Sequence, residues 1–330
     1  AEQLGIDHVE DWTSLEQFLA GQEASGGKIY YQRSEAQLPP NLSAGNLEGA
    51  PGWVQVLQER WRKLKFQPAG TKLSTLMAVQ SPSEMEAVHK AASATVKAIR
   101  AGMRAIHEGA SQRSVEAAVA QACWSAGARG VSFWPWAMAG ENGVFPKPFE
   151  SLSRYDHLES TMKAGDLTRL DVGCEWGHYQ GDLGRTVPVS GKYTDEQREI
   201  WTIFVAAYHA GVKQLREGRT EDDVYEAWKE ELLRQGRMAR SSLAKLAIEK
   251  WSDRKNVPYW QVHTMNLEAG YVDGPLRAGM TINFEPIASI GGQGYFLEDM
   301  YLIGKDGAER LTQGVPYSAE EIEAEMKQRQ

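Results

Sequence analysis

Two mirrored pairs of carboxylates constrain the fold of this chain more than any other feature of its sequence. Asp171 and Asp182 lie symmetrically about residues 176–177, and Glu285 and Glu298 repeat the arrangement about a pair of glycines. On a regular antiparallel hairpin, residues placed in this way face each other on one surface. Their Cβ atoms are then roughly 4.5–5.5 Å apart, where like charges are destabilising unless a positive group lies between them. The pattern predicts two hairpins that present their carboxylates to a cation.

The sequence around these carboxylates is apolar. Asp171 lies in LDVG, Glu285 in INFEP and Glu298 in FLED. A carboxylate in such surroundings is costly to bury unless it is paired or bound to a metal. His263, in the strand-like segment WQVH between the hairpins, adds an imidazole, the commonest nitrogen ligand. Carboxylates and one imidazole suit two divalent cations such as Mn²⁺, Co²⁺ or Fe²⁺ better than a structural zinc. Metal-assisted hydrolysis is the predicted reaction class.

Composition excludes several other classes of protein. The chain has 330 residues, 42% of them hydrophobic and 24% charged, which is typical of a soluble globular protein of two units. Its net charge of −8 gives no basic surface for nucleic acid or an anionic membrane, so a peptide or other small substrate is the expected partner. No apolar stretch approaches the ~20 residues that span a bilayer. The start at Ala1 fits a removed export signal or Met excision equally well, so the compartment stays open between cytoplasmic and exported.

The two cysteines, Cys123 and Cys174, are too few for a disulfide framework and have no second thiol at zinc-ligand spacing. Both are predicted to be small, buried apolar residues.

The order of elements predicts two units, a short N-terminal one at 1–78 and a larger one at 79–330. Ser81 begins a capping box before a long helix, and a second, shorter helix and a β-rich region follow it. Thr194 and Thr220 open two further helices before the second β-rich region. Two helices followed by strands therefore occur twice, which predicts an α+β fold of two related halves with a site between them.

At this point the chain resembles a known family. The segments that carry the resemblance are QSPSEMEAVHKAA, DVGCEWGHYQGDLGRT, HTMNLE, GMTINFEP and FLEDMYLI, within about residues 75–315. They look like the signature of the pita-bread metallopeptidases, which include methionine aminopeptidase, Xaa-Pro aminopeptidase and prolidase, with creatinase as a metal-free relative. The resemblance is nearest to the Xaa-Pro aminopeptidase and prolidase branch. It implies a pita-bread fold with two pseudo-symmetric halves, a short or truncated creatinase-type N-terminal domain, and a homodimer.

The resemblance also implies a role for each of the five residues. Asp171 would hold one metal ion, His263 and Glu285 the other, and Asp182 and Glu298 would bridge the two. Glu285 would in addition be the catalytic proton acceptor for the attacking water. The expected cofactors are two divalent ions, Mn, Co, Fe or Zn, with Mn favoured.

Two positions depart from the family pattern. Family peptidases carry a histidine shortly after a Gly-x-Asn step, which falls on Lys147 here, and another seven residues after the ligand histidine, which falls on Gly270. Loss of one such donor can cost about 10²–10³ in rate. Lys147 and His178 are the candidate substrate-binding residues, and His157 is a further candidate.

Three hypotheses follow from these observations. The leading one is a dinuclear metallopeptidase that acts like Xaa-Pro aminopeptidase or prolidase. The second is a divergent metallohydrolase of the same fold that acts on a non-peptide amide or ester, because two family histidines are missing. The third is a non-catalytic binding module that reuses the fold.

Overall fold

The computed structural model divides the chain into two compact units, residues 1–76 and 77–330. It describes residues 14–31, 52–69, 77–145, 147, 160–257, 259–265, 269–271 and 274–328.

The described part of the first unit has two helices and two strands. These are α1 (Ser14–Ala24), β1 (Lys28–Tyr31), α2 (Gly52–Arg60) and β2 (Lys65–Pro68). β1 and β2 pair in parallel, and a small separate core joins the helices to them. Its buried members are Leu19, Tyr31, Val54, Leu64 and Phe66.

Capping residues set where the helices of the second unit begin. Ser81 Oγ accepts from the backbone N–H of Glu84, whose side chain accepts from the N–H of Ser81, so the predicted capping box is confirmed. Thr194 and Thr220 begin their helices in the same way. The helices are α4 (Pro82–Ala105), α5 (Gln112–Ser125), α7 (Asp195–Val212), α8 (Glu221–Gly236), α9 (Ser242–Trp251) and α10 (Ala319–Met326), with short 3₁₀ helices η4 (Gly140–Gly143) and η6 (Arg254–Asn256).

One antiparallel sheet crosses the second unit in the order β10-β9-β11-β12-β8-β5-β4, and β13 pairs with β12. Its strands are β4 (Trp136–Ala139), β5 (Leu167–Val172), β8 (Leu183–Pro188), β9 (Tyr259–Met265), β10 (Ala269–Tyr271), β11 (Thr281–Ile290), β12 (Gln293–Ile303) and β13 (Ala308–Arg310). A small sheet is formed by β3 (Gly130–Val131), β6 (Cys174–Trp176) and β7 (Tyr179–Gln180).

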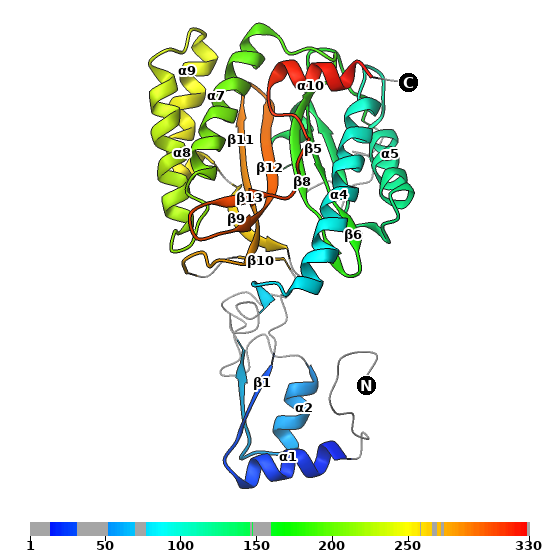
Figure 1. The fold of residues 1–330 in the computed structure, drawn as a ribbon, viewed down its shortest axis with the longest axis vertical. Helices are drawn as coiled ribbons and strands as arrows, with labels where there is room; N and C mark the ends of the chain where they lie inside the picture. The colour runs from blue at the N-terminus through cyan, green and yellow to red at the C-terminus, as the bar shows by residue number, and fades with distance from the viewer. Residues whose placement is uncertain are drawn as a thin grey trace. The chain divides into compact units, whose positions relative to one another are not determined.

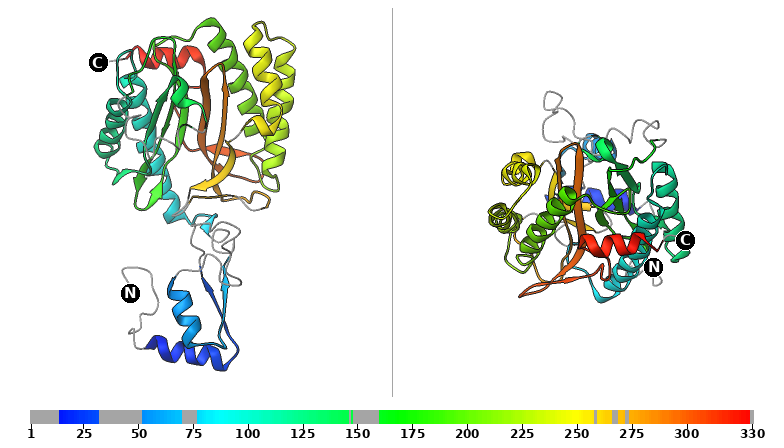
Figure 2. Two further views of the ribbon diagram at one scale, coloured as in Figure 1. Left: turned by 180° about the vertical axis from the view of Figure 1, so that it is seen from behind. Right: turned by 90° about the horizontal axis from the view of Figure 1, so that it is seen from above.

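Helices cover the outside of this sheet in two groups. In Figure 1, α4 and α5 lie beside β5 and β8, while α7, α8 and α9 lie beside β11. The view from above in Figure 2 shows the same two groups on opposite sides of the strands. The halves join where β12 pairs with β8. The predicted α+β class with two related halves is confirmed.

The second carboxylate hairpin has the predicted register. β11 pairs Phe284 with Asp299 and Ile287 with Phe296, which places Glu285 opposite Glu298. The two glycines at its turn, Gly291 and Gly292, both have positive φ, as a tight two-residue turn requires.

The register predicted for the first hairpin is wrong by two residues. The turn is formed by Gly177 and His178, with φ of 56° and 70°, and not by residues 176–177. β5 therefore pairs Asp171 with Gly184, and Asp182 lies diagonally across from Asp171. A shift of two residues preserves the face of a strand, so both carboxylates still lie on one surface.

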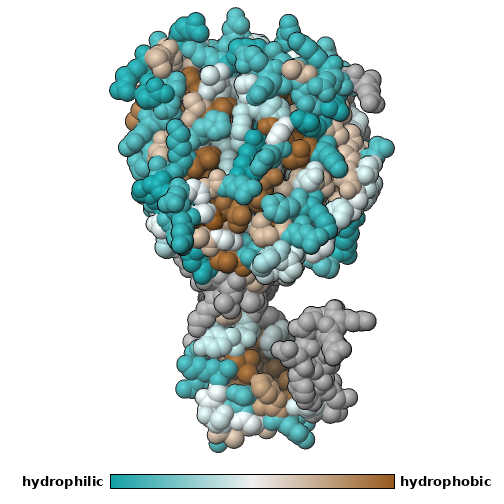
Figure 3. Space-filling view, viewed as in Figure 1, coloured by the Kyte–Doolittle hydropathy of each residue, from teal (hydrophilic) through white to brown (hydrophobic). Residues whose placement is uncertain are grey.

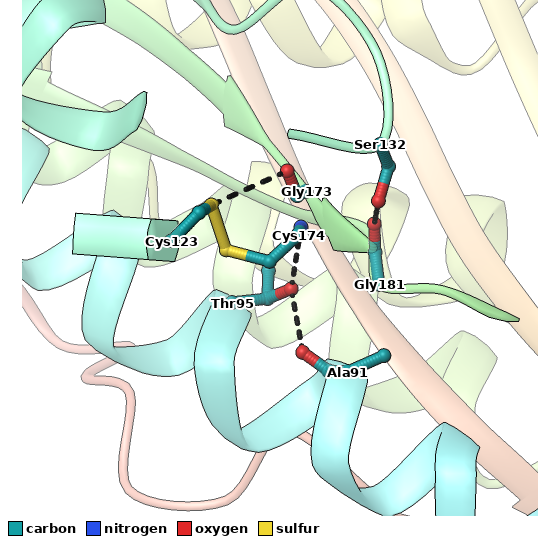
Figure 4. Close-up of a disulfide and its surroundings, with 7 residues drawn as sticks. All are labelled: Ala91, Thr95, Cys123, Ser132, Gly173, Cys174 and Gly181. Carbon is teal, nitrogen blue, oxygen red and sulfur yellow. Dashed lines mark hydrogen bonds between the residues drawn. A yellow bond between two sulfur atoms is a disulfide. The ribbon is translucent and has the colours of Figure 1, made fainter. Parts of the chain in front are cut away.

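A disulfide joins Cys123 of α5 to Cys174 of β6, beside this hairpin (Figure 4). The two Cα atoms are 5.4 Å apart and both side chains are fully buried. Thr95 of α4 links Cys174 to this helix. Its Oγ1 accepts a hydrogen bond from the N–H of Cys174 at 2.9 Å and donates one to the carbonyl of Ala91, also on α4, at 2.8 Å. The prediction of burial is confirmed, but the prediction of two unlinked residues is wrong.

On the face shown in Figure 3, hydrophilic side chains cover most of the described surface, and hydrophobic ones lie between them in small groups. None of the helices in the described ranges is long and apolar enough to cross a membrane.

The disulfide predicts a measurable loss of stability. Replacing both cysteines, Cys123→Ala with Cys174→Ala, should lower the free energy of unfolding by about 2–4 kcal/mol, because a loop closed over 51 residues no longer restricts the unfolded chain. Urea denaturation of oxidised and variant protein measures the difference. Thiol titration of the denatured, unreduced protein is the control, and two reactive thiols there would contradict the pairing.

Candidate metal centre

The structure brings together all five of the residues predicted to bind metal. Each is buried, with at most 7% of its surface exposed. They come from both halves of the sheet: Asp171 from β5, Asp182 from the residue before β8, His263 from β9, Glu285 from β11 and Glu298 from β12.

Strand register explains why these side chains meet. Gly184 of β8 pairs with Asp171 on one side and with Glu298 on the other, so the three residues form one row across the sheet. On the other half, His263 pairs with Asn283, two residues before Glu285 and therefore on the same face. The residues project from one surface because the backbone hydrogen bonds fix their alignment.

The imidazole of His263 lies among three carboxylates. Its Nε2 is 3.4 Å from Glu285 Oε2, 3.4 Å from Glu298 Oε1 and 3.9 Å from Asp182 Oδ2. Asp182, His263 and Glu298 each offer one ligand atom within 4.8 Å of the others, close enough to share one ion.

Unsatisfied oxygens show that this cluster suits a cation. Asp182 Oδ1 and Glu298 Oε2 are buried and have no hydrogen-bond partner among the described residues. Buried carboxylate oxygens in proteins are normally hydrogen-bonded, paired or bound to metal. Oxygen-rich donors with one imidazole also match the preference of divalent Mn, Fe, Co and Zn. The residues present therefore fit the divalent metal that the sequence predicts.

Burial and crowding shift the protonation of the cluster. Burial raises the pKa of Asp171 and of Asp182 well above the usual range, and the neighbouring carboxylates add to the effect. Burial and the charge of Glu298 raise the pKa of Glu285 to about 7. Burial disfavours the charged form of His263, but hydrogen bonds to Glu285 and Glu298 outweigh it and raise the pKa to about 10. A cation that binds here would displace protons, so its affinity should rise with pH.

Two polar residues in the cluster were not singled out from the sequence. Asn283 is fully buried, and its Nδ2 donates to Glu298 Oε1 at 2.8 Å and to the carbonyl of Asp182 at 3.1 Å. Arg169 is 2% exposed, and its Nη2 donates to Asp171 Oδ2 at 3.0 Å. The available signal was spacing, because each precedes a carboxylate of the cluster by two residues on the same strand.

The candidate substrate residues lie differently. Lys147 Nζ donates to Glu141 Oε2 at 3.0 Å in a half-exposed ion pair. His178 is at the tip of the β6–β7 turn, with 70% of its side chain exposed, and its ring is 3.7 Å from Glu175 Oε1. Within the described ranges, no contact links either residue to the cluster. Gly270 lies on β10 and offers no side chain, and His157 falls outside the described residues.

Arg185 supports the cluster from behind. Its Nη2 contacts both oxygens of Asp299, at 3.2 and 3.0 Å, and its Nη1 donates to the carbonyl of Glu298 at 2.7 Å. Both members of this ion pair are fully buried. The pair holds the backbone of β12 next to Glu298 and does not touch the carboxylates of the cluster.

Comparisons with known proteins agree with this geometry. The family described as metallopeptidase family M24 matches residues 86–305. The chain is 29% identical to Xaa-Pro aminopeptidase of Escherichia coli strain K12, over 98% of this chain and 76% of that protein. It is 26% identical to Xaa-Pro dipeptidase of Pyrococcus horikoshii, over 79% of this chain and 70% of that protein.

Solved structures show the same fold. Aminopeptidase P from E. coli with the inhibitor Pro-Leu has a TM-score of 0.75 at 23% identity, covering 99% of this chain and 76% of that one. Prolidase from Pyrococcus furiosus has a TM-score of 0.66 at 23% identity, covering 82% and 75%. The pita-bread fold and the resemblance predicted from the sequence are confirmed.

Because the carboxyl groups of the cluster crowd one another, removing one of them should make the metal-free protein more stable. In protein stripped of metal with a chelator, Asp182→Asn should raise the free energy of unfolding by about 1–3 kcal/mol, because burial and the neighbouring carboxylates raise the pKa of Asp182 and make its ionised form costly in the folded state. Urea denaturation of the metal-free proteins measures the change.

Glu325→Gln is the matched control. Glu325 is also buried, but it is paired with Arg104 at 2.7 Å, so its replacement should lower stability. Equal losses in the two variants would contradict electrostatic crowding in the cluster.

Proposed function

Because this chain belongs to metallopeptidase family M24 and is therefore a metal-dependent hydrolase, we propose that it cleaves the bond before proline in peptides or dipeptides. The observation that carries the proposal is the convergence of five buried ligand-type side chains from both halves of the sheet. The names of its relatives, Xaa-Pro aminopeptidase and Xaa-Pro dipeptidase, support the substrate class.

The proposed cofactors are two divalent ions, with Mn²⁺ favoured. Asp171 would hold one ion, His263 and Glu285 the other, and Asp182 and Glu298 would bridge them. The chemistry supplied by such ions is polarisation of the scissile carbonyl and a lower pKa for the attacking water. The cluster is buried, so the effective dielectric constant around it is low and these charges interact strongly.

Glu285 is the proposed proton acceptor. Its two oxygens face different neighbours, because Oε2 lies 3.4 Å from His263 Nε2 while Oε1 lies 4.0 Å from Arg169 Nη2. A carboxylate held in this way can take a proton from water and pass it to the leaving amine. Proton transfer of this kind contributes typically about 10²–10⁴ to a rate.

A second candidate function keeps the metal centre and changes the substrate. Lys147 is engaged with Glu141, and Gly270 has no side chain to replace the second family histidine. Without those donors the site is suited to a substrate that needs less stabilisation of a tetrahedral oxyanion than a peptide does. This observation favours a non-peptide amide or ester as the alternative.

A substrate panel with a base variant tests the proposal. Protein loaded with Mn²⁺ should hydrolyse Xaa-Pro dipeptides or tripeptides, lose activity to a chelator, and lose at least about 10²-fold in kcat through Glu285→Gln. The variant should keep its circular dichroism spectrum, which separates lost chemistry from lost folding.

Amide and ester substrates without proline are the comparison set. Turnover of those compounds alone would favour the second function. Absence of bound metal at millimolar Mn²⁺, Co²⁺, Fe²⁺ and Zn²⁺ would contradict both.

A further inference from the structure

Arg169 brings a guanidinium to the side chains of the five-residue cluster. It lies on β5 two residues before Asp171, and only 2% of its surface is exposed. Its Nη2 donates to Asp171 Oδ2 at 3.0 Å and lies 4.0 Å from Glu285 Oε1. A buried arginine is expensive unless its charge is matched, and here the matching charges are two of the proposed ligands.

Aromatic rings hold this guanidinium in place. The ring centroid of Phe296 is 4.5 Å from Arg169 Cζ, and that of Trp136 is 5.6 Å from the same atom. Both distances are within the range in which a cation is attracted to an aromatic face. Trp136 of β4 pairs with Asp171 of β5, so the pairing of these two strands positions both the ring and the carboxylate.

A glycine on the strand between them makes this arrangement possible. Phe296 lies on β12 and Arg169 on β5, with β8 between the two strands. A Cβ atom at Gly184 of β8 would lie 1.8 Å from Cε1 of Phe296. The ring therefore occupies the space over β8 that any side chain at residue 184 would fill.

The ion pair engages only part of the arginine. Nε and Nη1 are buried and, among the described residues, have no hydrogen-bond partner. Unsatisfied guanidinium donors are costly, so the hydrogen bond from Nη2 to Asp171 Oδ2 is not enough by itself to set the position of Arg169. The ring of Phe296 and the carboxylate of Asp171 set this position together.

We propose that Arg169 is a positioning residue of the metal centre, which fixes the carboxylate of Asp171 for ion binding while Phe296 fixes Arg169. Partners that orient a ligand from outside the metal typically change affinity by about 10–100-fold when they are removed. The guanidinium also repels a cation, which acts in the opposite direction. Orientation outweighs repulsion because Arg169 shares its charge with Asp171 and Glu285.

Metal affinity of the folded protein tests this inference, which rests on the proposed function. Isothermal titration of chelator-treated protein with Mn²⁺ should show binding at least 10-fold weaker in Arg169→Met than in the unchanged chain. Arg169→Lys, which keeps a charge beside Asp171, should bind at least threefold more tightly than Arg169→Met. Affinity in Arg169→Met equal to or tighter than that of the unchanged chain would overturn the inference, as would equal affinities of the two variants.

A spectroscopic readout separates positioning from a purely structural role. Co²⁺ bound to Arg169→Met should show a visible absorption spectrum changed in intensity or position, because one ligand has lost its orientation. The matched control is Arg104→Met, which removes an arginine paired with Glu325 at 2.7 Å outside the cluster. It should leave affinity and spectrum unchanged. An unchanged Co²⁺ spectrum in Arg169→Met would count against positioning.

Phe296→Leu keeps the inference testable if Arg169→Met does not fold. It removes the ring against Arg169 and leaves every charge in place, so it should weaken Mn²⁺ binding by about 2–5-fold, less than loss of the arginine itself. Unchanged affinity would contradict the role of the ring. The two proposals fail separately: an unchanged chain that binds no metal refutes the proposed function, whereas normal binding in all variants refutes only the role of Arg169.

Discussion

The structure of the second unit depends on the burial of like charges on one face of a sheet. Asp171, Asp182, Glu285 and Glu298 are each less than 10% exposed. Two carboxylates 4 Å apart repel each other by roughly 4 kcal/mol at an effective dielectric constant of about 20. His263 and Arg169 supply the nearby positive groups in the protein itself. The remaining excess of negative charge is what makes a divalent cation the natural occupant.

The sheet can hold such a cluster because its backbone pairing fixes the positions of the side chains. Register places Asp171, Gly184 and Glu298 in a row, and two groups of helices pack on the sheet in one hydrophobic core. Arg185 and Asp299 then fix the backbone of β12 from behind. The fold as a whole offsets the cost of assembling the site, which is why ligand-type side chains from strands more than a hundred residues apart in sequence can be aligned.

Much of the fold and of the site could be predicted because the relevant signals are local. Capping boxes at Ser81 and Thr194 mark helix starts, and the apolar sequence around Asp171 and Glu285 marks buried carboxylates. The ligand-type residues could be identified because a charge that strand alternation forces into a core needs compensation. The family resemblance then implies a role for each of these residues.

Other features depend on distances that a sequence does not display. His178 adopts positive φ in the turn, which few residues other than glycine do, so the sequence predicts a register for the first hairpin that is two residues out. The cysteines are 51 residues apart, and only the packing of α5 on β6 brings them together. Nothing in the sequence distinguishes Arg169 from other strand residues, because the ring of Phe296 that lies against it comes from another strand.

Anomalous diffraction from crystals soaked in Mn²⁺ is the most direct test of the central claim that the buried carboxylates and His263 form a metal centre. The account predicts two anomalous peaks roughly 3.5–4 Å apart among these five side chains, with Asp182 and Glu298 contacting both. Peaks confined to exposed surface carboxylates, with none in the cluster, would contradict it.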